Sequence, residues 1–261
     1  MLHPRIIPCL LVQNKGLVKT TTFKDPKYVG DPINAVKIFN EKEVDELVVL
    51  DIDATVKNLE PNYTMIENLA FECRMPLCYG GGIKNIDQAL KIFSLGVEKI
   101  SVSSAAIHDP SLVSKISRQV GNQSVVVILD VKKKFLSSKY EIFINNGIKN
   151  TGINAVDFAK KMEDNGVGEI TINSIDNDGT MKGFDFNIVE KIREAVDVPL
   201  TILGGAGSYL DIGELIKKYG IIGAAAGSLF VFKGKYRAVL INYPSTEEKE
   251  KILQDYFLKY Y

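Results

Sequence analysis

Histidine and cysteine are scarce in this chain, and neither sign of charge is in excess. Two histidines, His3 and His108, are too few for a histidine-based metal site, and we expect no metal ion and no cofactor. The three cysteines, Cys9, Cys73 and Cys78, form neither an even disulfide framework nor a C-x-x-C pair, which favours reduced thiols. Lysine plus arginine and aspartate plus glutamate number 32 each, so the net charge gives no support to a nucleic-acid partner.

Long apolar runs are also missing. No stretch reaches the length of a membrane-spanning helix. The first five residues, Met1 to Arg5, do not begin a signal peptide with an apolar centre and a small-residue cleavage site. We therefore expect a cytoplasmic protein that does not associate with a membrane. With 261 residues, 46% of them apolar and 25% charged, the chain fits one large α/β barrel or two small domains.

Short apolar runs alternate with amphipathic stretches along the whole chain. The runs are rich in valine, isoleucine and leucine, which is typical of parallel strands covered on their outer side. Helical stretches such as Asp31–Asn40 and Ala155–Asn165 separate them. Eight such pairs predict a single (β/α)8 TIM barrel, an α/β fold, over residues 1–261; a doubly wound open sheet is the alternative. The expected strands are 5–11, 46–52, 77–80, 99–103, 125–131, 169–174, 200–203 and 223–226.

The two halves of the chain resemble each other. The segment Glu46–Asp53 aligns with Glu169–Asp176, and Pro76–Gly82 aligns with Pro199–Gly205. Strands one to four therefore repeat as strands five to eight, and we expect two duplicated half-barrels, at about 1–122 and 123–261, that close one ring. The polar insertion at 12–31 is expected to be a mobile loop that can act as a lid over the active face.

Each half contains a glycine-rich turn between a strand and a helix. Such turns point backbone N–H groups at an anion bound near a helix N-terminus. A serine ends the following strand in each half, beside the glycines. We predict two phosphate sites that face each other, bridged by a small molecule with a phosphate at each end; glycines that only make tight turns are the alternative. The expected phosphate-binding residues are Gly81, Gly82, Ser104, Gly204, Gly205, Gly207, Gly227 and Ser228.

Aspartates follow the carboxyl ends of two expected strands, where active sites of such barrels lie. Asp130 ends an apolar strand, so we expect it to be partly desolvated and to act as a general acid or base; an aspartate held by backbone N–H groups is the alternative. Asp176 is the candidate for relaying a second proton. The turn Asp176–Thr180 also resembles an oxygen-ligand loop, but no acidic residue closes it as in an EF-hand, so we expect no calcium.

Several stretches together resemble the cyclase subunit of imidazole glycerol phosphate synthase, over nearly the whole chain. The resemblance implies a (β/α)8 barrel that takes ammonia from a class-I glutaminase subunit docked on its N-terminal face. It also implies lyase chemistry in histidine biosynthesis, where a bisphosphate gives imidazole glycerol phosphate and an aminoimidazole carboxamide nucleotide. The resembling stretches are Arg5–Leu10, Asp45–Asp51, Tyr79–Ile83, Asp130–Lys132, Asn150–Ile153, Ser174–Thr180 and Gly204–Gly207.

The chain departs from that family where the chemistry takes place. The family uses two aspartates, ending strands one and five, as an acid–base pair; the second matches Asp130, whereas the first position is Leu11. Leucine transfers no proton, and losing one acid–base partner typically lowers the rate about 10²–10⁴-fold. Ser103 stands where the family has an asparagine, and Leu203 stands where it has a phosphate-binding serine.

The opposite end of the expected barrel matches the family. The family gates its ammonia passage with four charged residues at the N-terminal ends of strands one, two, four and six, and these match Arg5, Glu46, Lys99 and Glu169. Two cations and two anions on a barrel axis can satisfy one another, and leaving one unpaired would be costly. A purely structural ion cluster is the alternative.

Three functions are consistent with the resemblance. The first is the histidine-pathway cyclase. The second, which we favour, is a cyclase-like subunit that pairs with a glutaminase but no longer runs the cyclisation, similar to members in bacterial surface-sugar and lipopolysaccharide pathways that pass ammonia to a separate sugar amidotransferase. The third is a sugar-phosphate isomerase of the sister barrel family. Leu11 counts against the first and third, and the four-residue gate counts against the third.

Overall fold

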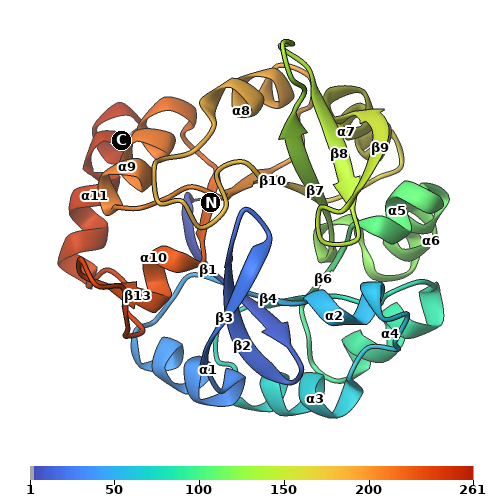
Figure 1. Cartoon of the computed structure of the whole chain (residues 1–261), viewed down its shortest axis with the longest axis horizontal. Helices are drawn as coiled ribbons and strands as arrows, with labels where there is room; N and C mark the ends of the chain where they lie inside the picture. Colours follow the sequence, from blue (N-terminus) through green and yellow to red (C-terminus); the bar gives the residue numbers. More distant parts are fainter. Residues whose placement is uncertain (1–2, 261) are drawn as a thin grey trace.

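Eight parallel strands close into a ring in the computed structural model, which describes the backbone of residues 3–260 and the side chains of residues 3–254 (Figure 1). Each strand pairs with the next along the chain, and β12 closes the ring on β1, where Arg5 lies opposite Gly223. The predicted TIM barrel is therefore confirmed, and the expected ends at residues 1–2 and 261 lie outside the described residues. The barrel strands are β1 (Arg5–Gln13), β4 (Leu47–Asp51), β5 (Leu77–Gly80), β6 (Lys99–Val102), β7 (Val125–Lys133), β10 (Glu169–Ser174), β11 (Leu200–Leu203) and β12 (Gly223–Ala226).

Helices surround the barrel on its outer side. The first begins where the sequence predicts, because the Asp31 side chain accepts a hydrogen bond from the Asn34 backbone at 2.9 Å and Pro32 occupies the first turn. Its buried face includes Val36 and Phe39. The helices are α1 (Pro32–Glu41), α2 (Ile52–Val56), α3 (Tyr63–Glu72), α4 (Ile86–Ser94), α5 (Ser104–His108), α6 (Ser111–Val120), the 3-10 turn η1 (Asn122–Ser124), α7 (Ala155–Asp164), α8 (Phe186–Arg193), α9 (Tyr209–Tyr219), α10 (Ser228–Val231) and α11 (Thr246–Tyr260).

Additional antiparallel strands extend three of the connections at the carboxyl ends of the barrel strands. The segment 12–31 is not the irregular loop that its polar composition suggested, because β2 (Gly16–Thr21) and β3 (Lys24–Gly30) form a hairpin that continues β1. Val18 of that hairpin pairs with Leu11, and the four residues Leu17 to Thr20 are all buried, which holds β2 on the barrel. The others are β8 (Tyr140–Ile144) and β9 (Lys149–Asn154), which extend β7, and β13 (Phe232–Lys233) with β14 (Ala238–Val239).

The main core lies between the barrel and its helices, while a smaller cluster fills part of the barrel lumen. This lumen cluster consists of Ile7, Cys9, Leu203 and Ala225, with Leu11 packed against it. Inward-facing positions alternate along each strand, so one end of the lumen is lined by the first inward residues and the other end by the last. In residues 3–260 none of the helices has the length and apolar character needed to cross a bilayer.

The two glycine turns make equivalent backbone contacts. Gly81 lies against the carbonyl of Asp51 at the end of β4, and Gly204 lies against the carbonyl of Ser174 at the end of β10. Both glycines have positive φ angles, +124° and +93°, so a side chain would be strained there as well as crowded. The equivalence agrees with the internal repeat, and the division into two half-barrels stays a prediction.

A pair of glycine substitutions tests the close packing between the β10 entry and the turn before β7. A Cβ on Gly168 would overlap the backbone carbonyl of Asn122, so Gly168→Ala must push the two segments apart. We expect it to lower the free energy of unfolding by about 1–3 kcal/mol, as overpacking typically does. Gly213→Ala, within α9, is the control. Its Cβ would meet no atom closer than 3.7 Å, so the substitution should stabilise the helix by up to about 1 kcal/mol. Denaturant unfolding of both variants checks this, and equal midpoints would contradict it.

Candidate active site

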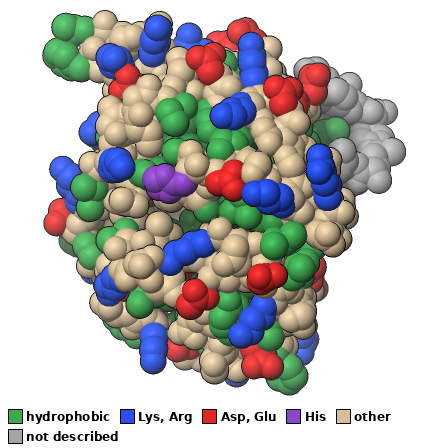
Figure 2. Space-filling model, turned by 90° about the vertical axis from the view of Figure 1, so that its right-hand side faces the viewer, with side chains coloured by type: hydrophobic (Ala, Val, Ile, Leu, Met, Phe, Trp, Pro, Cys, Tyr) green, Lys and Arg blue, Asp and Glu red, His purple; other side chains and the backbone are tan. Residues whose placement is uncertain are grey.

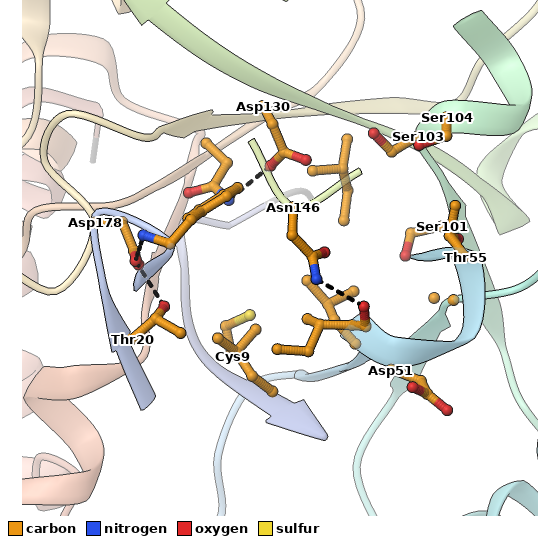
Figure 3. A pocket seen from close by; sticks show the side chains of 18 of the residues that line it. Cys9, Thr20, Asp51, Thr55, Ser101, Ser103, Ser104, Asp130, Asn146 and Asp178 are labelled. Atoms are coloured by element: carbon orange, nitrogen blue, oxygen red, sulfur yellow. Dashed lines mark hydrogen bonds between the residues drawn. The ribbon is translucent and has the colours of Figure 1, made fainter. Parts of the chain in front are cut away.

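A cavity of about 430 Å³ opens at the carboxyl ends of the barrel strands. Residues at or just after the ends of all eight strands line it, and the β2–β3 hairpin and the turn between β8 and β9 cover it. Figure 3 shows Asp178 at the left of the cavity, Asp130 at the top, and Ser101, Ser103 and Ser104 at the right. Such a cavity, enclosed by the barrel walls and holding few charged groups, is where a barrel of this kind binds its ligand.

Asp130 is the most perturbed carboxyl group in the cavity. It ends the barrel portion of β7, and its Oδ1 accepts a hydrogen bond from Asn173 Nδ2 of β10 at 2.8 Å. Burial raises the pKa of Asp130 to about 7, the hydrogen bond from Asn173 opposes the shift, and the nearby charge of Asp178 adds to it. A carboxyl group with this pKa can both take up and release a proton near neutral pH, which general acid or base chemistry requires.

Asp51 and Asp178 also line the cavity, whereas the predicted Asp176 does not. Asp176 is exposed, accepts a hydrogen bond from the Lys133 backbone at 3.1 Å, and does not line the cavity. Asp178 lines it and accepts hydrogen bonds from Thr20 Oγ1 at 2.9 Å and from the Phe23 backbone at 3.3 Å. Burial raises the pKa of Asp178 as well. Both aspartates lie in the turn that follows β10. The alternation of inward-facing and outward-facing side chains along the strand therefore does not predict which of the two faces the cavity.

Two cations flank the candidate phosphate residues after β12. Lys19 of the β2–β3 hairpin is buried and donates to the Cys9 carbonyl, and burial lowers its pKa. Its ammonium lies so close to Gly227 that a Cβ there would overlap it. Arg237 Nη2 lies 3.5 Å from Ser228 Oγ and donates to the Gly179 carbonyl at 3.2 Å. Positive charge beside Gly227 and Ser228 favours an anion at this point.

The candidate phosphate residues divide between those that line the cavity and those that do not. The β11 turn lies outside the lining, and its Gly207 N–H already donates to Asp211 Oδ2 at 2.8 Å, as part of the capping box of α9. That N–H is therefore not available to an anion, which corrects the expectation for Gly207. Leu203 lines the cavity in front of this turn. The lining includes Gly81, Gly82, Ser104, Gly227 and Ser228 but not Gly204, Gly205 or Gly207.

Leu11 faces the cavity at the end of the strand opposite Asp130. It packs with Leu50 and Leu203 on the lumen cluster, so this wall of the cavity is apolar. The opposite wall is polar, because Ser101 Oγ, Ser103 Oγ and Asn173 Oδ1 are buried without a hydrogen-bond partner among the described residues. Unpaired buried polar atoms beside a cavity mark positions where a polar ligand can bind.

Four charged side chains meet at the opposite end of the lumen, as the alignment with the family predicted. Arg5 Nη2 lies 2.9 Å from Glu169, Lys99 Nζ lies 2.9 Å from both Glu46 and Glu169, and Arg5 also pairs with Glu46. Burial alone would lower the pKa of Arg5 and of Lys99, but the two carboxylates raise it in both. The two cations in turn hold the pKa of Glu169 below its ordinary value, against the effect of its burial.

Sequence reasoning missed two cations at or beside the cavity, Lys19 and Arg237, and it preferred the aspartate that does not line the cavity. Asp178 stood in a motif that was recognised, but its neighbour Asp176 was preferred. Lys19 and Arg237 belong to segments that carried no motif, and they reach the site only because the hairpin and the segment after α10 fold back over the barrel. The adjacent apolar residues Leu17 and Val18, followed by Lys19 and then three threonines, were the one available signal for the hairpin.

Comparison with known proteins gives a consistent family. Residues 5–237 match the family described as histidine biosynthesis protein. A Vibrio vulnificus protein provisionally named an imidazole glycerol phosphate synthase subunit is 56% identical over 254 residues, 97% of this chain and 98% of its own length. A Pseudomonas aeruginosa protein with the same provisional name is 53% identical, over 95% of this chain and 98% of its own. A Clostridium botulinum imidazole glycerol phosphate synthase subunit, named without that qualification, is 40% identical over 89% of this chain and 92% of its own.

The raised pKa of Asp130 predicts a pH-dependent stability. The folded protein holds the Asp130 proton more tightly than the unfolded chain, so this group makes the free energy of unfolding fall as pH rises from about 4 to about 7. We expect Asp130→Asn to be more stable than the wild type at about pH 8, by up to a few kcal/mol, and close to it at about pH 4. Denaturant unfolding at both pH values checks this, with the exposed Asp164→Asn on α7 as the control. An Asp130→Asn variant destabilised equally at both pH values would contradict the assignment.

Proposed function

The chain belongs to the histidine biosynthesis protein family, and from this premise we propose that it is an imidazole glycerol phosphate synthase barrel subunit that receives ammonia from a glutaminase. In this proposal the glutaminase docks at the end of the barrel that carries Arg5, Glu46, Lys99 and Glu169. Ammonia passes through the lumen to the cavity at the other end. The observation that carries the proposal is that the four-charge cluster is intact while the cavity has Leu11 in place of a carboxylate.

The lumen supports passage of a small neutral molecule. The ion cluster satisfies its own charges, so opening it requires only a rearrangement of paired side chains rather than the exposure of a lone charge. Beyond it, one wall of the lumen carries the hydroxyl groups of Ser101, Thr171 and Thr201, and the other carries the apolar lumen cluster. Hydroxyl groups can hydrogen-bond to ammonia on its way, and the apolar wall keeps ions out.

The cavity supports binding of a phosphorylated small molecule. Gly81, Gly82 and Ser104 lie on one side of it, and Gly227 with Ser228 lie on the other. Lys19 and Arg237 add positive charge to the second side. A phosphate would bind at each position, with Leu203 narrowing the approach to the second.

Cyclisation is the step that the cavity supports least. The family's acid–base pair spans the barrel mouth between strands one and five, and here only Asp130 remains. One carboxyl group does not readily serve as acid and base on opposite sides of a substrate. We therefore propose that cyclase activity is impaired and that the ammonia serves a separate sugar amidotransferase in a surface-sugar pathway.

The histidine-pathway cyclase is the second candidate, and Asp178 favours it. Its carboxyl group lies in the same cavity as Asp130, and burial raises the pKa of both. Asp178 is already bonded to the hairpin, however, through the Thr20 hydroxyl and the Phe23 backbone. These bonds fix its carboxylate and make it a poor replacement for a carboxylate at position 11.

The glutaminase interface is tested by two exposed apolar residues at opposite ends of the barrel. Phe71 is 91% exposed at the end of α3, which precedes β5 and so lies at the N-terminal face, while Leu136 is 92% exposed on the β7–β8 turn at the carboxyl face. We expect a 1:1 complex with a class-I glutaminase, weakened about tenfold or more by Phe71→Glu and unchanged by Leu136→Glu. Calorimetry on the purified proteins measures both. Failure of the folded wild-type chain to bind the glutaminase at micromolar concentration would remove the proposal.

The cyclisation rate with saturating ammonium salt tests the role of Leu11 without the glutaminase. We expect turnover of the bisphosphate substrate at least about 10²-fold below that of a competent cyclase. Leu11→Asp should recover part of the rate, because it restores a proton-transferring group, and should reduce stability because it places a carboxylate against an apolar cluster. Leu11→Asn is the matched control with similar shape and no titrating group. A wild-type rate near about 1 s⁻¹ would move the histidine-pathway cyclase to first place.

A further inference from the structure

Positive charge is concentrated in three segments at the carboxyl ends of the barrel strands. These segments, 14–30, 132–150 and 232–240, follow β1, the barrel portion of β7, and β12 with α10, respectively, and we call them the mouth surface. The first holds four lysines and one aspartate, the second five lysines and one glutamate, and the third two lysines and one arginine with no acid. One of the twelve cations, Lys19, is buried and turned toward the cavity, so the mouth surface has eleven other cations against two acids, in a chain whose 32 cations and 32 anions balance.

Exposed apolar side chains gather on the same segments. Of the thirteen large apolar side chains exposed within residues 3–254, seven lie on the mouth surface. Phe135 is 88% exposed and Tyr236 is 90% exposed, and Tyr28 and Ile148 are also exposed. The β7–β8 turn, which projects at the top of Figure 1, is the hydrophobic projection with flanking cations at the upper left of Figure 2. Large apolar side chains clustered on one face in this way are typical of a protein contact.

The three segments form one continuous surface around the cavity. Lys27 of the first lies over the ring of Phe232 in the third, with its Nζ 5.6 Å from the ring centre. Phe23 of the first packs so closely on Gly147 of the second that a Cβ there would lie 3.0 Å from its ring. Phe23, Asn146 and Ile148 also line the cavity itself. A partner seated on the mouth surface would therefore cover the opening of the cavity.

We propose that the mouth surface is the docking site of the enzyme that accepts the ammonia, and that this enzyme presents an acidic face. The proposal rests on the proposed function, because it assumes that ammonia reaches the cavity from the opposite end. Docking there places the acceptor's active site against the cavity opening, so ammonia enters it without passing through water. An acidic face complements the eleven cations other than the buried Lys19 and speeds association, while Phe135, Leu136 and Tyr236 supply apolar area to bury.

Attraction of an anionic small molecule does not account for this surface. Charge alone would guide a phosphorylated ligand to the cavity. Attraction by charge does not explain why Phe135, Leu136 and Tyr236 are exposed to solvent. These side chains lie on two separate turns and do not line the cavity. A protein partner accounts for the charge and the apolar tips together.

Two pairs of substitutions on the β7–β8 turn test the docking site. Lys133→Glu with Lys139→Glu reverses charge, and Phe135→Ser with Leu136→Ser removes apolar area; none of the four residues lines the cavity. The acceptor to be assayed is an ammonia-dependent sugar amidotransferase, if one is encoded in the same gene cluster as this chain. The Kd to be measured is that of the acceptor for the complex of this chain with the glutaminase. We expect each pair of substitutions to raise this Kd at least about tenfold. Lys160→Glu with Lys161→Glu, exposed on α7, is the matched control and should leave the Kd unchanged.

Activity separates docking from the proposed function itself. With glutamine as nitrogen source, amidation by the acceptor should fall in parallel with the Kd, whereas with saturating ammonium salt it should be unaffected. All variants should bind the glutaminase as the wild type does. Unchanged acceptor binding and glutamine-dependent amidation in both pairs would overturn the docking site while leaving the glutaminase partnership intact. Failure of the wild type to bind the glutaminase, or a gene cluster without such an amidotransferase, would instead overturn the proposed function.

Two other occupants of the mouth surface are outcomes of the same experiment. The first is a membrane. It would be assigned if vesicles of phosphatidylglycerol and phosphatidylcholine bound the wild-type chain but neither of the two doubly substituted variants. Self-association of the chain that both pairs abolish would assign it to a second copy. Either result, with acceptor binding unchanged, would overturn the proposal.

Discussion

Closure of the parallel strands into a ring is the constraint on which the rest of the molecule depends. The pairing of β12 with β1 forces alternate residues of every strand into one lumen, so residues from distant parts of the chain meet at two ends. Arg5, Glu46, Lys99 and Glu169 meet at one end because each is the first inward residue at the start of its strand. Leu11, Asp130 and Leu203 meet at the other because each ends one.

The two ends of the barrel lumen differ in whether they stabilise charged side chains. At the N-terminal end, two cations and two anions lie within hydrogen-bond distance, and each stabilises the charged form of its partners. At the carboxyl end, burial and the nearby charge of Asp178 disfavour the charged form of Asp130, and the hydrogen bond from Asn173 only partly offsets them. A cluster of paired charges is stable without a change of protonation, whereas a carboxyl group with a pKa of about 7 is suited to proton transfer.

The β2–β3 hairpin joins the cavity to the mouth surface. Its Thr20 and Phe23 bind the carboxylate of Asp178, and its Lys19 reaches the residues after β12. The same hairpin contributes Lys27 and Tyr28 to the outer surface. A partner that contacts the outer side of the hairpin therefore touches an element that also builds the cavity, which gives a physical connection between docking and the ligand site.

The sequence by itself determined the barrel and its eight strands to within about two residues at most boundaries, because short apolar runs separated by amphipathic stretches are visible locally in the chain. Its resemblance to the family also identified the four charged residues that meet at the N-terminal end of the lumen. The departure from the family at Leu11 was equally visible in the sequence, because a leucine side chain cannot transfer a proton. Only the tertiary structure decided that Asp178 rather than Asp176 enters the cavity and that segment 12–31 is a hairpin carrying Lys19 inward. These outcomes depend on turns that break strand alternation and on contacts between segments more than a hundred residues apart, such as Thr20 with Asp178, which no local pattern encodes.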